Sequence, residues 1–156
     1  MEAIVIVRDI EYPVYSSPVT LPPPSVEELS SRLEHCKEMM RQRGLTHLLV
    51  YGDREHFANL MYLTNFDPRF EEALLIVRLK DKPLILVGNE CVGHLGVSPL
   101  YVAGELRYER FQTFSLMNQP RNASRRLETI LCEEGIGTES YVGMVGWKYF
   151  LDSELD

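Results

Sequence analysis

Apolar residues recur every three or four positions between residues 25 and 43, a spacing that places them on one face of a helix. Ser25 and Glu28 form the S-x-x-E pattern of a capping box, which predicts that the helix begins just after Ser25. Gly44 predicts the end of the helix, because glycine readily adopts the left-handed conformation found after helix C-termini. An apolar run over 46–51 then predicts a short buried strand. The apolar face of the helix consists of Val26, Leu29, Leu33, Cys36 and Met40.

The next part of the chain predicts a helix, a turn and two strands. Asp53 is expected to cap a second helix over 54–62, and residues 65–69 are expected to form a turn. Strands are predicted over 72–79 and 83–87. Because only a short polar turn separates these two strands, we expect them to form an antiparallel hairpin.

The last third of the chain predicts one more helix between two strands. The strands fall over 106–114 and 141–145, and the helix falls over 122–134 with Gly135 at its end. Helices that alternate with strands, combined with a hairpin, predict an α/β domain with a mixed sheet. The residues predicted to be buried in its core are Leu29, Leu33, Leu49, Leu75, Ile76, Leu86 and Leu131.

Residues 1–24 differ from the rest of the chain. Five prolines stand at positions 13, 18, 22, 23 and 24, and a proline run is incompatible with a helix interior or a central strand. We therefore predict a short strand over 4–7 followed by an extended proline-rich arm up to residue 24. The globular domain is expected to span residues 25–150.

Composition and charge exclude several classes of protein. The 156 residues are 45% hydrophobic with a net charge of −7, and nucleic acid or an anionic membrane would require a basic face instead. No apolar run approaches the roughly 20 residues of a membrane-spanning helix. Cys36, Cys91 and Cys132 are odd in number and far apart, which favours free thiols in a cytoplasmic protein.

Known catalytic and metal-binding motifs have no match, so the sequence predicts no catalytic residue and no metal ligand. Residues 88–93 have the glycine spacing of a phosphate-binding loop but lack the lysine that should follow. Cys91 and His94 are close enough in sequence to form a site, although an ordinary surface loop is the simpler interpretation. Glu71 and Glu72 stay open as a carboxylate pair, against the simpler interpretation of a solvated strand entry. The basic residues Arg121, Arg125 and Arg126 predict either a solvated helix face or a contact with an acidic partner.

The segment Asn59–Phe66, with the sequence NLMYLTNF, resembles the N-x-x-Y-L-T-G-F segment of a known family. That segment belongs to the N-terminal domain of the creatinase, prolidase and aminopeptidase P family, the pita-bread metallopeptidases. The order of predicted elements over residues 25–150 is also similar to this domain. Asn65 stands where the family usually has glycine, and asparagine also tolerates a left-handed turn.

This resemblance implies a three-layer α/β/α fold with a mixed sheet of the ribonuclease H-like type. In the family, two divalent metal ions (Mn, Co or Zn) belong to a separate C-terminal domain, and its Asp, His and Glu ligands have no counterpart in this chain. The chain itself is therefore expected to hold no cofactor. Residues 151–156 are expected to begin the linker to an absent C-terminal catalytic domain.

The implied function is that of a non-catalytic N-terminal domain of a dinuclear-metal hydrolase, which acts on Xaa-Pro bonds or on creatine-like substrates. Such a domain supports a homodimer and contributes to the rim of the active site. The matching rim residues are Asn59, Tyr62, Phe66 and Arg69. The alternative for Tyr62 and Phe66 is that they pack the helix against the sheet. The aromatic residues expected at the dimer contact are Tyr12, Tyr15, Tyr101, Tyr108 and Trp147.

Two other functions remain open at this stage. The chain could be a stand-alone protein-binding module with a peptidase-like fold and no catalysis, or a small enzyme whose site follows no known motif. The reading frame beyond Asp156 distinguishes these functions from the first, because a catalytic domain of roughly 220 residues would follow only in the first case.

Overall fold

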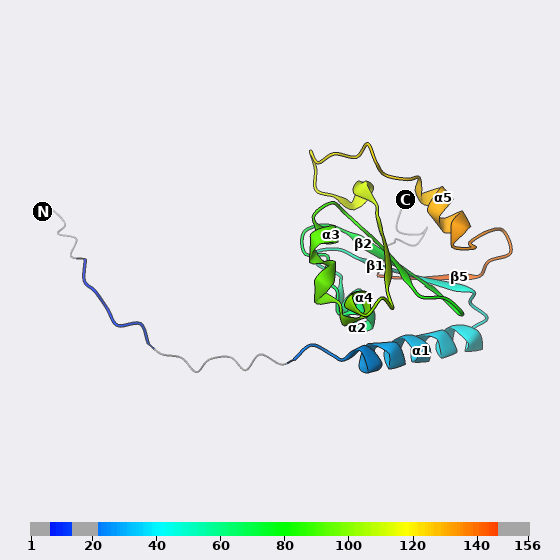
Figure 1. The fold of residues 1–156 in the computed structure, drawn as a ribbon, viewed down its shortest axis with the longest axis horizontal. Coiled ribbons are helices and arrows are strands. Elements are labelled where there is room, and N and C mark those ends of the chain that lie inside the picture. Colours follow the sequence, from blue (N-terminus) through cyan, green and yellow to red (C-terminus); the bar gives the residue numbers. More distant parts are fainter. Residues whose placement is uncertain (1–6, 14–21, 147–156) are drawn as a thin grey trace, which may run out of the picture.

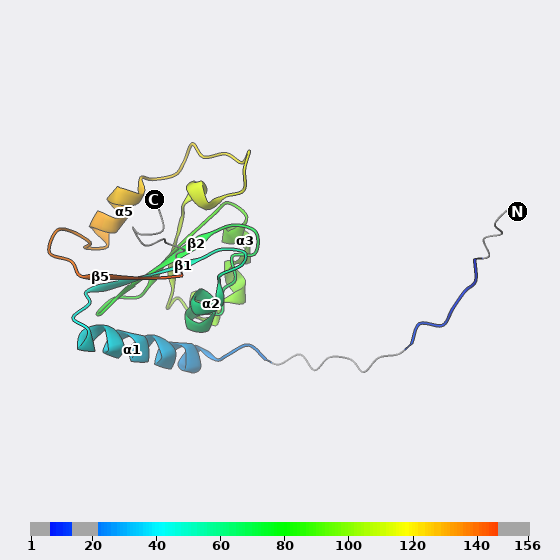
Figure 2. The ribbon, with the colours of Figure 1, turned by 180° about the vertical axis from the view of Figure 1, so that it is seen from behind.

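A computed structural model describes residues 7–13 and 22–146, and it contains a five-stranded sheet with helices on both faces (Figures 1 and 2). The strands are β1 (His47–Gly52), β2 (Ala73–Arg78), β3 (Leu84–Val87), β4 (Arg107–Arg110) and β5 (Val142–Val145). The helices are α1 (Val26–Gln42), α2 (Ala58–Thr64), α3 (Cys91–His94), α4 (Pro99–Val102) and α5 (Leu127–Glu133), with the 3-10 turns η1 (Leu95–Val97) and η2 (Gln112–Phe114).

The sheet is mixed, as predicted. Its strand order is β4-β3-β2-β1-β5. The hairpin of β2 and β3 is antiparallel, and β1 also runs antiparallel to β2. The two outer strands pair in parallel, β5 with β1 and β4 with β3. The three-layer α/β/α prediction is therefore confirmed.

Strand β2 is apolar throughout because both of its faces are buried. Leu75 and Val77 point to the core on the side of α1, α2 and α4, whereas Leu74 and Ile76 point to the side of α5. The core beneath α1 is the larger one, and α1 contributes Leu29 to it. Side chains alternate across a sheet, so a strand covered on both sides reads as a continuous apolar run.

The smaller core lies between the sheet and α5. Phe111 and Phe114 stack edge to face, with ring centroids 4.8 Å apart, and Ile130 packs beside them. The prediction that Leu131 would be buried is wrong, because Leu131 is only partly buried and Ile130 takes the inward position. The other six predicted core residues are buried.

Two helices begin later than the sequence pattern predicted. Helix α2 begins at Ala58, because the Asp53 carboxylate accepts the backbone N–H groups of Glu55 (2.8 Å) and His56 (2.7 Å) in a separate turn. Helix α5 begins at Leu127 rather than residue 122. The backbone N–H of Ala123 donates to the side-chain oxygen of Gln112 (2.7 Å), which holds the preceding segment out of the helix.

Two further predictions differ in part from the structure. The strand expected over 106–114 is confined to β4 and is followed by η2. In the capping box, Ser25 Oγ accepts the N–H of Glu28 (3.2 Å) as expected. The Glu28 carboxylate, however, accepts a hydrogen bond from Arg32 (2.9 Å), which lies one turn further along α1.

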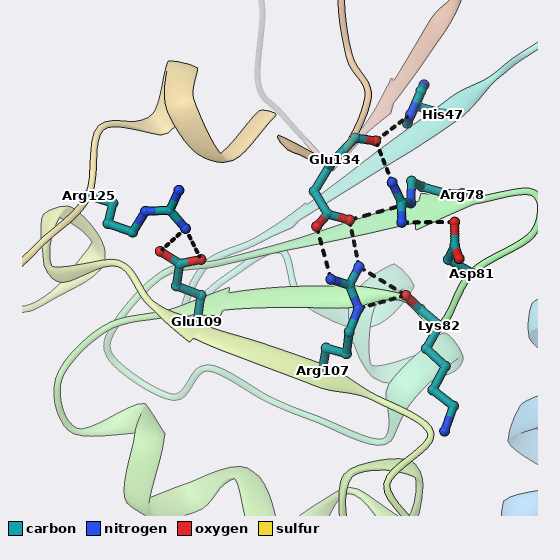
Figure 3. A network of polar contacts seen from close by, with 8 residues as sticks. All are labelled: His47, Arg78, Asp81, Lys82, Arg107, Glu109, Arg125 and Glu134. Atoms are coloured by element: carbon teal, nitrogen blue, oxygen red, sulfur yellow. Dashed lines mark hydrogen bonds and ion pairs between the residues drawn. The ribbon is translucent and has the colours of Figure 1, made fainter. Parts of the chain in front are cut away.

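A network around Glu134 attaches the C-terminal end of α5 to the sheet (Figure 3). The carboxylate of Glu134 is buried and accepts two hydrogen bonds from Arg107, at 3.0 and 2.6 Å. Its backbone carbonyl accepts a hydrogen bond from Arg78 Nη1 (3.0 Å) and lies 3.0 Å from His47 Nε2. Arg78 also pairs with Asp81 (2.8 Å). One residue thus connects α5 to β1, β2 and β4.

Several predictions concern parts of the chain that the structure describes only in part. Residues 7–13 are exposed and contain no helix or strand. Residues 4–6 of the predicted N-terminal strand, residues 14–21 of the predicted arm and the predicted linker 151–156 lie outside the described residues. Among the residues that are described, no helix is long and apolar enough to cross a membrane.

Candidate functional site

The segment Asn59–Phe66 forms α2 and the turn that ends it. Asn65 has a φ of 56°, in the left-handed region, and its N–H donates to the carbonyl of Met61 (2.7 Å). The side chain of Asn65 donates to the carbonyl of Val97 (3.0 Å), which ties the turn to η1. Asn65 therefore adopts the left-handed conformation at the position where the family with the similar segment usually has glycine.

Thr64, the residue before this turn, stabilises the turn through buried hydrogen bonds. Thr64 is buried, and its hydroxyl donates to the carbonyl of Leu60 (2.7 Å) and accepts the N–H of Phe66 (3.1 Å). The carbonyl of Thr64 accepts a hydrogen bond from the hydroxyl of Ser98, which is also buried (2.5 Å). The exposed side chains around the turn are thus carried by a rigid backbone.

The four predicted rim residues occupy three different environments. Asn59 and Tyr62 are exposed and three residues apart on α2, so they share one face of the helix. Phe66 is fully buried, with its ring centroid 5.8 Å from that of His94, so its side chain belongs to the core. Arg69 is exposed in the following loop with a φ of 60°.

Tyr62 is held by a residue of α1 that the sequence did not single out. The guanidinium of Arg32 lies 4.6 Å from the centre of the Tyr62 ring, which is a cation–π distance. Arg32 Nη1 also donates to the carbonyl of Tyr62 (2.9 Å). Sequence reasoning missed Arg32 because 30 residues separate it from Tyr62.

Arg69 lines a hollow of about 220 Å³ next to α2. The other lining residues are Pro68, Phe70, Glu71, Glu90, Cys91 and His94. Phe70 is 55% exposed, and the Arg69 guanidinium lies 5.6 Å from the centre of its ring. The hollow therefore presents a cation, an exposed aromatic ring, an imidazole and a carboxylate around one opening.

Glu71 also lines this hollow, and it has a structural role. Its buried carboxylate accepts the backbone N–H groups of Glu90 (3.2 Å) and Cys91 (2.9 Å). A Cβ at Gly88 would lie 2.5 Å from Glu71 Oε2, so only glycine leaves room for the carboxylate. Glu71, one member of the carboxylate pair identified in the sequence, therefore connects the segment before β2 to the start of α3.

Cys91 is buried and donates its thiol to the carbonyl of Pro68 (3.0 Å). Burial, reinforced by the nearby charge of Glu71, raises the pKa of the Cys91 thiol to about 12. A thiol with this pKa stays protonated at neutral pH and is therefore a poor nucleophile. His94 packs on Phe66. Within residues 7–13 and 22–146, no group of three or more His, Cys, Asp or Glu side chains could hold a metal ion.

The comparisons with known proteins give matches among solved structures alone. No protein-family model matches the chain, and no match was found among the curated proteins. In fold, the chain is similar to creatinase/prolidase-like N-terminal domains of peptidases.

Three solved structures illustrate this similarity. The N-terminal creatinase/prolidase-like domain of a putative metallopeptidase from Corynebacterium diphtheriae is 12% identical, with a TM-score of 0.46 over 79% of this chain and 98% of that one. An Xaa-Pro aminopeptidase from Streptococcus pyogenes is 19% identical, with a TM-score of 0.40 over 76% and 92%. The dipeptidase PepE from Mycobacterium ulcerans is 19% identical, with a TM-score of 0.43 over 54% of this chain and 22% of that one. This chain thus spans about a fifth of PepE, and the similarity concerns the fold and not an activity.

Proposed function

We propose that this chain is the non-catalytic N-terminal domain of a dinuclear-metal hydrolase of the Xaa-Pro peptidase or creatinase type. Its role is to support a homodimer and to contribute side chains to the rim of an active site in a C-terminal domain. The observation that carries the proposal is the segment Asn59–Phe66. It resembles the family segment in sequence, and Asn65 adopts the left-handed conformation that the family's glycine position requires.

The environments of three of the four predicted rim residues support a role at the rim of an active site. Asn59, Tyr62 and Arg69 are exposed, and the backbone that carries them is fixed by Thr64, Ser98 and Asn65. Rigid placement is what a substrate-positioning group requires. Phe66 acts from the core, where it supports α2. The two divalent metal ions, Mn, Co or Zn, would be bound by the C-terminal domain.

The first experiment reads the native reading frame past Asp156. A following segment of roughly 220 residues with Asp, His and Glu ligands supports the proposal, because this is the size of one large domain. A stop codon near Asp156 would instead support the stand-alone binding module. The 156-residue chain by itself is expected to hydrolyse no Xaa-Pro peptide and to retain no Mn, Co or Zn after dialysis, as measured by elemental analysis.

The second experiment tests the rim role in the full-length protein. Replacement of Tyr62 or Arg69 by Ala should lower kcat/KM for an Xaa-Pro or creatine-like substrate without lowering the thermal unfolding temperature. Val102→Ala is the matched control, because Val102 is 72% exposed on α4 and is not part of the predicted rim. If the Tyr62 and Arg69 variants both retained the wild-type kcat/KM, the rim role would be excluded.

A further inference from the structure

A second hollow, of about 210 Å³, lies between α1 and the turn that connects β2 to β3. Three of the chain's four lysines line it, and we call it the lysine hollow. One of these lysines comes from α1 and two come from the turn, so the fold brings together residues that are more than 40 positions apart in sequence. The charged lining residues are Lys37, Lys80 and Lys82, with Glu34, Asp81 and Glu105.

Lys37 is the buried lysine of this hollow. Its side chain is only 10% exposed, and its ammonium group donates to the carboxylate of Glu34 (2.8 Å), whose own side chain is 62% exposed. An ammonium group has three N–H donors. Among the residues that the structure describes, Glu34 is the only hydrogen-bond acceptor of Lys37. Because buried donors are normally satisfied, the two other N–H groups of Lys37 require acceptors in the space of the hollow.

The two lysines of the turn add further positive charge to the lining. Lys80 is exposed and forms no hydrogen bond or ion pair with any residue in the described part of the chain. Lys82 donates to the carbonyl of Gly104 (2.9 Å) and pairs with Glu105 (3.3 Å). The side chain of Lys82 extends away from Glu134, so its ammonium group is not part of the Glu134 network (Figure 3).

The three carboxylates of the lining are already neutralised by cations. Glu34 and Glu105 pair with lysines of the hollow itself. Asp81 pairs with Arg78 (2.8 Å), which is not among the lining residues. The charge of Lys80 is therefore left without a counterion among the described residues. A chain with a net charge of −7 thus keeps a local excess of positive charge at this hollow, which favours an anionic ligand.

We propose that the lysine hollow binds a phosphate group through Lys37, Lys80 and Lys82. Lysine is a common phosphate ligand and acts as a point charge, whereas a planar carboxylate is matched best by a bidentate arginine, and no described arginine lines this hollow. A water molecule takes about 30 Å³ of the liquid, so the hollow has room for a phosphate group with a few water molecules and little else. None of the predicted rim residues lines it, so this proposal does not rest on the proposed function.

Titration of the 156-residue chain with inorganic phosphate, followed by amide NMR at an ionic strength held constant with chloride, tests the proposal. The amide signals of Lys37 and of residues 80–82 should shift along saturable curves in the millimolar range. Lys80→Gln should raise the dissociation constant about fivefold, because it removes one exposed charge contact. Arg54→Gln is the matched control, because Arg54 is exposed and does not line the hollow, and it should leave the constant unchanged. Shifts that do not saturate, or equal dissociation constants for the two variants, would overturn the proposal.

Two further ligands and one further variant identify the anion and the buried donor. Acetate should bind more weakly than phosphate, and equal binding of acetate would overturn the assignment to phosphate. Methyl phosphate distinguishes the two sources of the group: binding at least as tight as that of inorganic phosphate supports a phosphate ester as the ligand, and weaker binding supports the free ion. Lys37→Met should abolish the saturable shifts at residues 80–82, because the buried donors are lost. Unchanged phosphate affinity in this variant would exclude Lys37 and overturn the proposed site.

Discussion

At the scale of single residues, Asn65 shows how a turn is satisfied without glycine. Its left-handed backbone costs more than that of glycine, but its side chain gains a hydrogen bond to Val97 that glycine cannot make. The two effects are similar in size, at about 1 kcal/mol each. This balance explains how the chain departs from the family segment at this position and keeps the turn.

The first prediction follows from this balance. Asn65→Gly should leave the free energy of unfolding within about 1 kcal/mol of the wild type, because one gain and one loss cancel. Asn65→Val should lower it by about 1–3 kcal/mol, because a β-branched residue is strained at positive φ. Urea unfolding of both variants measures the difference. Equal stabilities of the Val and Gly variants would contradict the assigned turn.

The second prediction concerns the thiols. Cys132 is exposed and should react rapidly with Ellman's reagent at pH 8, whereas Cys91 should react only after unfolding. The folded pKa of Cys91, about 12, is above the ordinary value of 9.0, so the folded state holds the proton more tightly. Its contribution to stability is complete below pH 9 and is lost as the pH rises from 9 toward 12. Cys91→Ala should therefore lose less stability over this range than the wild type does, and an identical alkaline loss in both proteins would contradict the assignment.

At the scale of elements, Glu134 attaches α5 to three strands. The third prediction is that Glu134→Gln lowers the free energy of unfolding substantially. Breaking a fully buried ion pair costs about 3–5 kcal/mol, and the cost here falls toward the lower end because Arg107 is partly exposed. The neighbouring Glu133→Gln is the matched control, because its pair with Arg125 is exposed and contributes at most about 1 kcal/mol. Chemical unfolding of both variants measures the difference, and equal losses would show that the network does not anchor α5.

Elements were predictable where local signals determine them. Helix α1 was predicted within a residue at each end, because an apolar face, a capping serine and Gly44 all act within the segment. The starts of α2 and α5 were predicted too early, since they depend on side chains that bind the backbone in other ways. Asp53 closes a separate turn, and Gln112 holds Ala123 from 11 residues away.

The residues of the candidate site were also predictable only where local sequence determines them. The exposed face of α2 was accessible from the sequence through the resemblance of one eight-residue segment. The roles of Arg32 and Glu71 were not accessible in this way. Arg32 is 30 residues away from its partner Tyr62, and Glu71 is about 20 residues away from Glu90 and Cys91. Nothing in the local pattern around Arg32 distinguishes it from an ordinary solvated helix residue, and only tertiary structure assigns its role.

At the scale of the whole molecule, the fourth prediction is weak self-association of the 156-residue chain. Among the aromatic residues proposed for the dimer contact, Tyr12 is 85% exposed and Tyr108 is 44% exposed, and Tyr108 stacks edge to face with Tyr101 at 5.6 Å. Tyr15 and Trp147 lie outside the described residues. Exposed aromatic side chains contribute most of the energy of protein interfaces, so these positions are the best anchors for a second copy.

Sedimentation over a concentration series measures this association. We expect a homodimer that dissociates at micromolar concentration, because a contact anchored by a few exposed aromatic residues is expected to bury less than the roughly 1,200–2,000 Å² of a stable interface. Replacement of Tyr12 and Tyr15 by Ser should shift the equilibrium toward monomer, since a proline-rich segment is expected to lose little entropy when it is ordered against a partner. Met117→Asp is the control, because Met117 is 86% exposed and lies outside the arm, and it should not shift the equilibrium. A monomer at high micromolar concentration in all of these proteins would exclude self-association through this arm, and the homodimer would then require the C-terminal domain.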